Sequence, residues 1–101
     1  MMNNEAAADP AEGEAIGQLA GAPARILVVE DDRDVAGLVG REMRSLGLIV
    51  DVIGFAEDAL VAARATDYAL MIVDLGLPDR DGLDLVREMR KRAIATPILM
   101  M

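Results

Sequence analysis

The sequence contains no cysteine, histidine or tryptophan, and only one tyrosine and one phenylalanine. Without cysteine, the chain has neither a disulfide framework nor a thiolate metal site. Without histidine, it has no imidazole for acid–base catalysis or metal binding. Because aromatic side chains are so scarce, we expect a core of aliphatic residues and methionine, and the hydrophobic fraction of 53% is sufficient to form one. These absences exclude many classes of enzyme.

Long apolar runs and an excess of positive charge are also missing. No apolar run approaches the ~20 residues that a membrane-spanning helix needs, and the N-terminus lacks the basic and apolar regions of a secretory signal. The net charge is −8, which argues against direct nucleic-acid binding because contacts with phosphates require Lys and Arg. We therefore expect a cytoplasmic location, no membrane partner and no direct contact with nucleic acid.

The 101 residues suffice for one domain at most. Residues 1–24 are rich in Ala, Gly, Glu and Pro, and they predict a disordered leader, since such a segment buries too little apolar surface to offset its ordering entropy. Apolar segments then alternate with segments of helical spacing. Strands are expected at 25–29, 48–53, 68–74 and 97–101, and helices at about 35–46, 56–63 and 81–92. This alternation predicts an α/β fold with a parallel sheet and right-handed crossovers.

Two of the predicted strands end in acidic residues. Glu30-Asp31-Asp32 follows the first strand, and Asp74 follows the third, ahead of a loop rich in Gly, Pro and Asp. Neighbouring parallel strands end at the same edge of a sheet, where open α/β folds place their ligands. Carboxylates that meet there repel one another, and Mg²⁺ removes the repulsion because it prefers oxygen ligands. The pattern predicts an Mg²⁺ site in which Asp74 is available for chemistry.

Each of these acids also has a structural explanation. Asp32 or Asp34 can cap a helix, and Asp79 and Asp81 can stabilise turns. A single aspartate at a strand end, such as Asp74, is more often a loop residue than a nucleophile. The combination of acids at two strand ends with a Gly/Pro loop favours a metal site over these explanations.

The two acidic motifs resemble those of the receiver domain of bacterial two-component response regulators. The segment Ile26–Asp32 is similar to the first strand and acidic cluster of that family, and Val73–Gly82 is similar to its phospho-acceptor strand and loop. The resemblance covers residues 25–101. It implies a flavodoxin-like, doubly wound parallel sheet, here incomplete after the fourth strand, and a signalling domain that phosphorylates itself from a phospho-donor rather than a conventional enzyme.

The resemblance also implies a role for each residue of the site. Asp74 would take a phosphoryl group from a sensor histidine kinase or a phosphotransfer protein. Asp31, Asp74 and the backbone carbonyl of Gly76 would bind Mg²⁺ directly, and Glu30 would act through a metal-bound water. Asp32 would be a helix cap or an outer-shell charge. The Leu-Gly-Leu-Pro-Asp loop is common in regulators with a winged-helix DNA-binding output, which indicates a transcription factor as the parent protein.

The end of the sequence departs from the family pattern. Receivers carry a hydroxyl residue after the fourth strand and a phosphate-binding lysine after the fifth, and both are absent from this sequence, which ends at Met101. We therefore expect a fragment in which the fourth strand is an exposed apolar edge that favours self-association. The alternative is a truncated receiver that acts only as a non-phosphorylated protein-interaction module.

Other classes of protein fit the pattern less well. Aspartyl-phosphate hydrolases and toprim-type Mg²⁺ enzymes also place acids at the ends of parallel strands, but both need a second acid where this sequence has Gly76. A nucleotide-binding fold is disfavoured because Glu30-Asp31-Asp32 occupies the turn in which a glycine-rich phosphate loop would lie.

Overall fold

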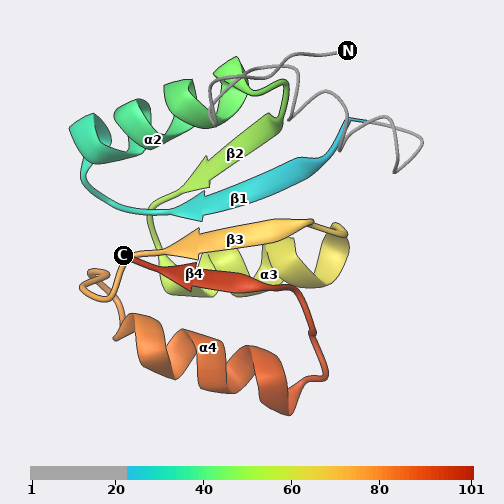
Figure 1. The fold of residues 1–101 in the computed structure, drawn as a ribbon. Coiled ribbons are helices and arrows are strands. Elements are labelled where there is room, and N and C mark those ends of the chain that lie inside the picture. The colour runs from blue at the N-terminus through green and yellow to red at the C-terminus, as the bar shows by residue number, and fades with distance from the viewer. Residues whose placement is uncertain (1–22) are drawn as a thin grey trace.

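The computed structural model describes residues 23–101, which fold into a parallel sheet with helices on both faces (Figure 1). Within this range the strand order is β2-β1-β3-β4, and every neighbouring pair is parallel. The elements in chain order are β1 (Arg25–Val29), α2 (Arg33–Ser45), β2 (Ile49–Ile53), α3 (Ala56–Ala65), β3 (Leu70–Val73), α4 (Gly82–Lys91) and β4 (Ile98–Met100). The predicted α/β class is confirmed, and the boundaries of the strands differ from the prediction by two residues at most.

The predicted leader falls almost entirely on residues 1–22, which lie outside the described residues. The last position of that segment, Ala24, is buried, and its carbonyl accepts a hydrogen bond of 2.9 Å from the Ile49 amide. The pairing with β2 therefore already includes Ala24, the residue ahead of β1.

The two central strands explain why the apolar runs in the sequence are continuous. Leu27, Val28 and Val29 of β1 are fully buried, as are Met71 and Val73 of β3. A parallel strand with helices on both faces has no solvent-facing side, so polar residues would be buried at every position. The outer strand β2 alternates more between buried and exposed residues, and Asp51 lies within it.

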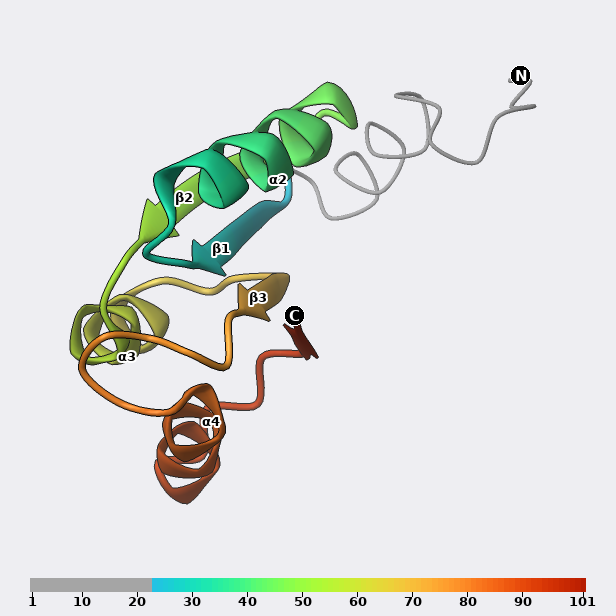
Figure 2. The ribbon, with the colours of Figure 1, turned by 90° about the vertical axis from the view of Figure 1, so that its left-hand side faces the viewer.

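Helix α2 covers one face of the sheet, and α3 and α4 cover the other (Figure 2). On the α3–α4 face, a large apolar cluster joins the strands to the helices, with Leu60, Leu85 and Met89 among its buried members. On the α2 face, a smaller cluster is built from four strand residues, against which Val39 and Met43 pack: Ile26, Val28, Val50 and Ile72.

The apolar residues that give the segment 35–46 its helical spacing are only partly buried in α2. Val39 and Met43 do pack onto the sheet, but the side chains of Val35 and Leu38 are 37% and 54% exposed. Their places against the sheet are taken by smaller residues of the same helix, Ala36 and Gly40, which are buried. A Cβ atom at Gly40 would lie 3.1 Å from the guanidinium of Arg44 and 3.9 Å from Val50, so Gly40 lies at the contact between α2 and β2.

The helix ends agree with the local signals in the sequence. The carboxylate of Asp32 accepts hydrogen bonds from the backbone amides of Asp34 and Val35 and caps α2. Gly47, with a φ of 86°, follows the last turn of that helix in the left-handed region that favours glycine. Asp81 caps α4 through the Leu83 amide at 2.9 Å. None of the helices in the described part of the chain is long and apolar enough to cross a membrane.

Candidate metal centre

Three of the predicted site residues lie together at the carboxyl ends of β1 and β3. One carboxylate oxygen from each of Glu30, Asp31 and Asp74 lies within 4.8 Å of the other two. The sheet register causes this proximity, because Val29 is paired with Val73 and the Asp74 amide donates to the Val29 carbonyl at 2.9 Å. The residues that follow these two strands therefore leave the sheet side by side.

The three carboxylates differ in their exposure to solvent. Glu30 is buried, with 7% of its surface exposed, whereas Asp74 is half-buried and Asp31 is exposed. Burial raises the pKa of Glu30, the backbone amide of Asp32 opposes this by donating to its carboxylate at 3.0 Å, and the neighbouring Asp74 and Asp31 raise the pKa further. The centre thus concentrates like charges in a place that is partly withdrawn from water.

A divalent cation fits this arrangement. Within residues 23–101, no ion pair involves Glu30, Asp31 or Asp74, so no basic side chain of the described chain neutralises the cluster. Oxygen donors without a counter-charge are the ligand set that Mg²⁺ prefers. The chemistry of the donor set therefore matches the cofactor that the sequence predicts.

The remaining acids at this edge have structural contacts. Asp32 caps α2, as predicted, whereas Asp81, which was predicted to stabilise a turn, caps α4. Asp34 lies in the first turn of α2, where the positive end of the helix dipole stabilises a negative charge.

The loop between β3 and α4 holds Asp74 in a compact turn. The Gly76 amide donates to Oδ1 of Asp74 at 3.3 Å, and the Gly82 amide donates to the Leu75 carbonyl at 2.8 Å. A Cβ atom at Gly82 would lie 2.4 Å from the Asp74 carbonyl oxygen, so only glycine allows the start of α4 to approach β3 this closely. Gly76, whose carbonyl is a predicted ligand, is an exposed residue of this turn.

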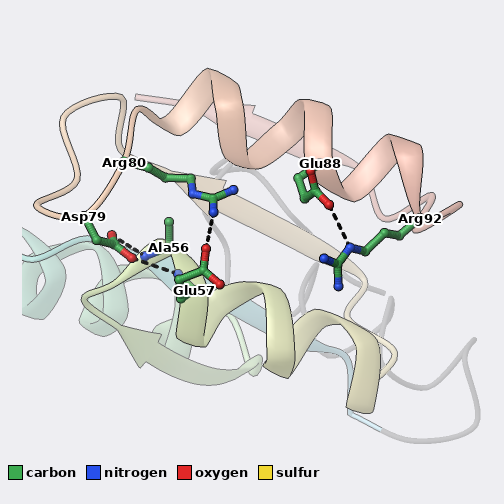
Figure 3. A network of polar contacts seen from close by, with 6 residues as sticks. All are labelled: Ala56, Glu57, Asp79, Arg80, Glu88 and Arg92. Atoms are coloured by element: carbon green, nitrogen blue, oxygen red, sulfur yellow. Dashed lines mark hydrogen bonds and ion pairs between the residues drawn. The ribbon is translucent and has the colours of Figure 1, made fainter.

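Asp79 has a role that its assignment to a turn did not predict. Its carboxylate accepts hydrogen bonds from the backbone amides of Ala56 at 2.8 Å and Glu57 at 3.0 Å, so it caps α3 from another part of the chain (Figure 3). The residue before this helix is Phe55, which offers no side-chain cap. The first amides of a helix that begins after a phenylalanine need acceptors from elsewhere. The phenylalanine before α3 was therefore the signal in the sequence that a distant residue caps this helix.

The comparisons with known protein families agree with this geometry. The family described as the response regulator receiver domain matches residues 26–101. The transcriptional regulatory protein TcrA of Mycobacterium tuberculosis is 34% identical over 89 residues, which cover 88% of this chain and 34% of that relative. The chain thus spans about a third of the length of the curated relatives it matches.

Solved structures show the same fold. The response regulator TrrA of Thermotoga maritima, in complex with Mg²⁺ and BeF, is 31% identical and has a TM-score of 0.72, covering 76% of this chain and 67% of that one. The same regulator in complex with the histidine kinase ThkA has a TM-score of 0.71, covering 76% and 66%. With the family matched over residues 26–101 and the sheet order and acidic edge in place, this chain belongs to the response regulator receiver domains of two-component systems.

Proposed function

We propose that this chain is a phospho-accepting receiver in which Asp74 takes a phosphoryl group in the presence of Mg²⁺. The observation that carries the proposal is the convergence of Glu30, Asp31 and Asp74 within 4.8 Å at the joint end of β1 and β3. In the proposed site, Asp31, Asp74 and the Gly76 carbonyl hold the metal, and Glu30 acts through a metal-bound water. Mg²⁺, when bound, would neutralise the negative charge that gathers as the carboxylate approaches the phosphoryl group.

In this proposal, Asp74 is the nucleophile. One of its carboxylate oxygens attacks the phosphorus of a phosphohistidine, the P–N bond breaks, and the imidazole leaves with the electron pair. The amide of Gly76 orients the carboxylate through Oδ1, and the buried backbone of β3 holds it in place. The product is an acyl phosphate, and its added charge can bias the surrounding loops between two arrangements.

The partners of the proposed function follow from the relatives. Since TrrA has been solved with the histidine kinase ThkA, we propose a sensor histidine kinase or a phosphotransfer protein as the phospho-donor. Since TcrA is a transcriptional regulatory protein, we propose a parent protein with a DNA-binding output. We also propose that the 101-residue chain associates with itself through β4, whose side chain Leu99 is 56% exposed and which contains no charged residue.

The decisive experiment is the intact mass of the chain after incubation with acetyl phosphate and Mg²⁺. We expect a gain of one phosphoryl group that hydroxylamine removes and that Asp74→Asn abolishes. Asp67→Asn is a matched control, because Asp67 is exposed and precedes β3 at its other end, and it should still gain the group. A folded wild-type chain that gains no mass would instead favour the non-phosphorylated interaction module.

A further inference from the structure

The segment that leads from the end of β2 into the first turn of α3 contacts the backbone on both sides of the acidic centre. On the β1 side, the Glu30 amide donates to the Ile53 carbonyl at 2.9 Å, and a Cβ atom on Gly54 would lie 3.6 Å from Cα of Asp31. The short connection from β2 to α3 is therefore packed directly against the backbone that carries Asp31. Only one residue, Phe55, separates Gly54 from the first residue of α3, so a displacement of the helix start should also move this contact.

On the β3 side, the same turn is held by Asp79. This residue belongs to the loop that begins at Asp74, and it reaches 23 positions back along the chain to accept from the amide of Ala56. Both amides that it binds are among the four that a helix cannot satisfy internally, and an ionised acceptor makes these bonds shorter and stronger than neutral ones. The same two amides lower the pKa of Asp79, as expected for a carboxylate that is ionised in the folded protein.

We propose that Asp79 is a positioning residue for the metal centre, because it clamps the loop that carries Asp74 and Gly76 onto the start of α3, directly after the connection that packs against Asp31. This inference rests on the proposed function and extends it. Asp79 does not touch the metal in this proposal. It sets the distance between the two sides of the site, so that the ligand atoms are already in place when the cation arrives.

The adjacent residue provides a matched comparison. Arg80 forms an ion pair with Glu57, so it also joins the loop to the first turn of α3 (Figure 3). However, this pair joins the ends of two long side chains, with the Glu57 side chain 59% exposed, and an exposed ion pair fixes a geometry poorly because solvent screens it. Asp79 instead binds the backbone itself, so the clamp should depend on Asp79 far more than on Arg80.

The test is the affinity of the 101-residue chain for Mn²⁺, measured from the signal of the free ion in electron paramagnetic resonance. We expect Asp79→Ala to weaken binding about tenfold, the lower end of what outer hydrogen-bond partners of metal sites contribute. Asp79→Asn keeps one acceptor oxygen and should lose less, and Arg80→Ala should stay within about twofold of the wild type. Asp31→Ala, which removes a proposed ligand, should abolish binding.

Three results would overturn the inference. If Asp79→Ala melts at a lower temperature but binds Mn²⁺ as tightly as the wild type, Asp79 is a helix cap and no more. If Arg80→Ala loses as much affinity as Asp79→Ala, any disturbance of the loop suffices and Asp79 has no special part. If the wild-type chain binds no Mn²⁺ at all, the proposed function fails and this inference fails with it.

A second measurement needs no variant and so does not depend on the variants folding. Coupling between two sites is reciprocal, so metal bound at the centre should strengthen the clamp. Saturating Mg²⁺ should therefore slow hydrogen exchange of the Ala56 and Glu57 amides by more than that of the Leu60 amide, which reports the general stabilisation of α3. Equal slowing at all three amides would contradict the proposal.

Discussion

The two faces of the sheet are packed very differently. On the α3–α4 face, apolar side chains from both helices and the strands form one continuous cluster. On the α2 face, the cluster is smaller, and two strand residues that belong to this face by their pairing, Val52 beside Val28 and Leu99 beside Ile72, remain exposed. The larger buried cluster predicts that side chains on the α3–α4 face contribute more to stability than those on the α2 face.

The largest effect should come from a cavity on the α3–α4 face. Leu85 of α4 is fully buried, so Leu85→Ala should lower the free energy of unfolding by about 2–5 kcal/mol. Leu38→Ala, the same change on α2, should cost about 0.5 kcal/mol or less because that side chain is largely exposed. Urea unfolding of the two variants measures the contrast, and equal losses would mean that Leu38 is packed as well as Leu85, contrary to its exposure in the structure.

A pair of glycines tests the same contrast by adding a methyl group. Gly82→Ala would place Cβ 2.4 Å from the Asp74 carbonyl, and the forced shift should cost about 1–3 kcal/mol. Among the described residues, no atom outside the neighbouring helix backbone lies within 4 Å of a Cβ at Gly37 of α2, so Gly37→Ala should stabilise the helix by up to about 1 kcal/mol. The melting temperatures of the two variants should thus shift in opposite directions. A destabilised Gly37→Ala variant would show that the space beside Gly37 is too small for a methyl group.

A smaller effect is expected from the polar network at the amino end of the sheet. Asp51 accepts from the Tyr68 hydroxyl at 2.7 Å and pairs with Arg25 at 2.9 Å. The Tyr68 hydroxyl, with help from Arg25, holds the pKa of Asp51 below its ordinary value of 3.8, although burial opposes this. Because the folded pKa is lowered, the network stabilises the fold above about pH 4 and this stabilisation is lost as pH falls through the folded pKa.

Unfolding measurements across the acid range check this prediction. Wild type should be more stable than Asp51→Asn at pH 7, and the difference should shrink below about pH 4. Tyr68→Phe removes the largest cause of the lowered pKa, so in that variant the loss should be smaller and should be complete at a higher pH. A constant difference between wild type and Asp51→Asn at every pH would show that the charge of Asp51 does not contribute.

The smallest effect on stability should come from the exposed edge of the α2 face. Leu99→Lys places a charge on β4 where the side chain is already exposed, so the free energy of unfolding should change by about 0.5 kcal/mol or less. Its effect on self-association should be large, because a charged residue discourages pairing of edge strands. Sedimentation velocity should show less association for Leu99→Lys and no change for Val61→Lys, whose side chain on α3 is somewhat more exposed. A fall in both would assign the effect to net charge alone.

The sequence by itself determined the parallel α/β fold and the acids at its edge. Continuous apolar strands, helical spacing and capping residues such as Asp32 and Asp81 are local signals, and they act through neighbours within a turn or two. The meeting of Asp31 with Asp74 could also be predicted, because adjacent parallel strands must end at the same edge. The family resemblance then supplied the roles that such acids have.

Only the tertiary structure decided which residues contact each other across the fold. Asp79 looks like a turn residue and Asp51 looks like a break in a strand, yet each binds partners far away in the chain, Ala56 in one case and Tyr68 in the other. Leu38 has the spacing of a core residue but is exposed, because Ala36 and Gly40 let α2 lie close to the sheet with another side inward. Such contacts depend on the way whole elements pack, and packing is set by all the side chains at an interface rather than by any one stretch of sequence.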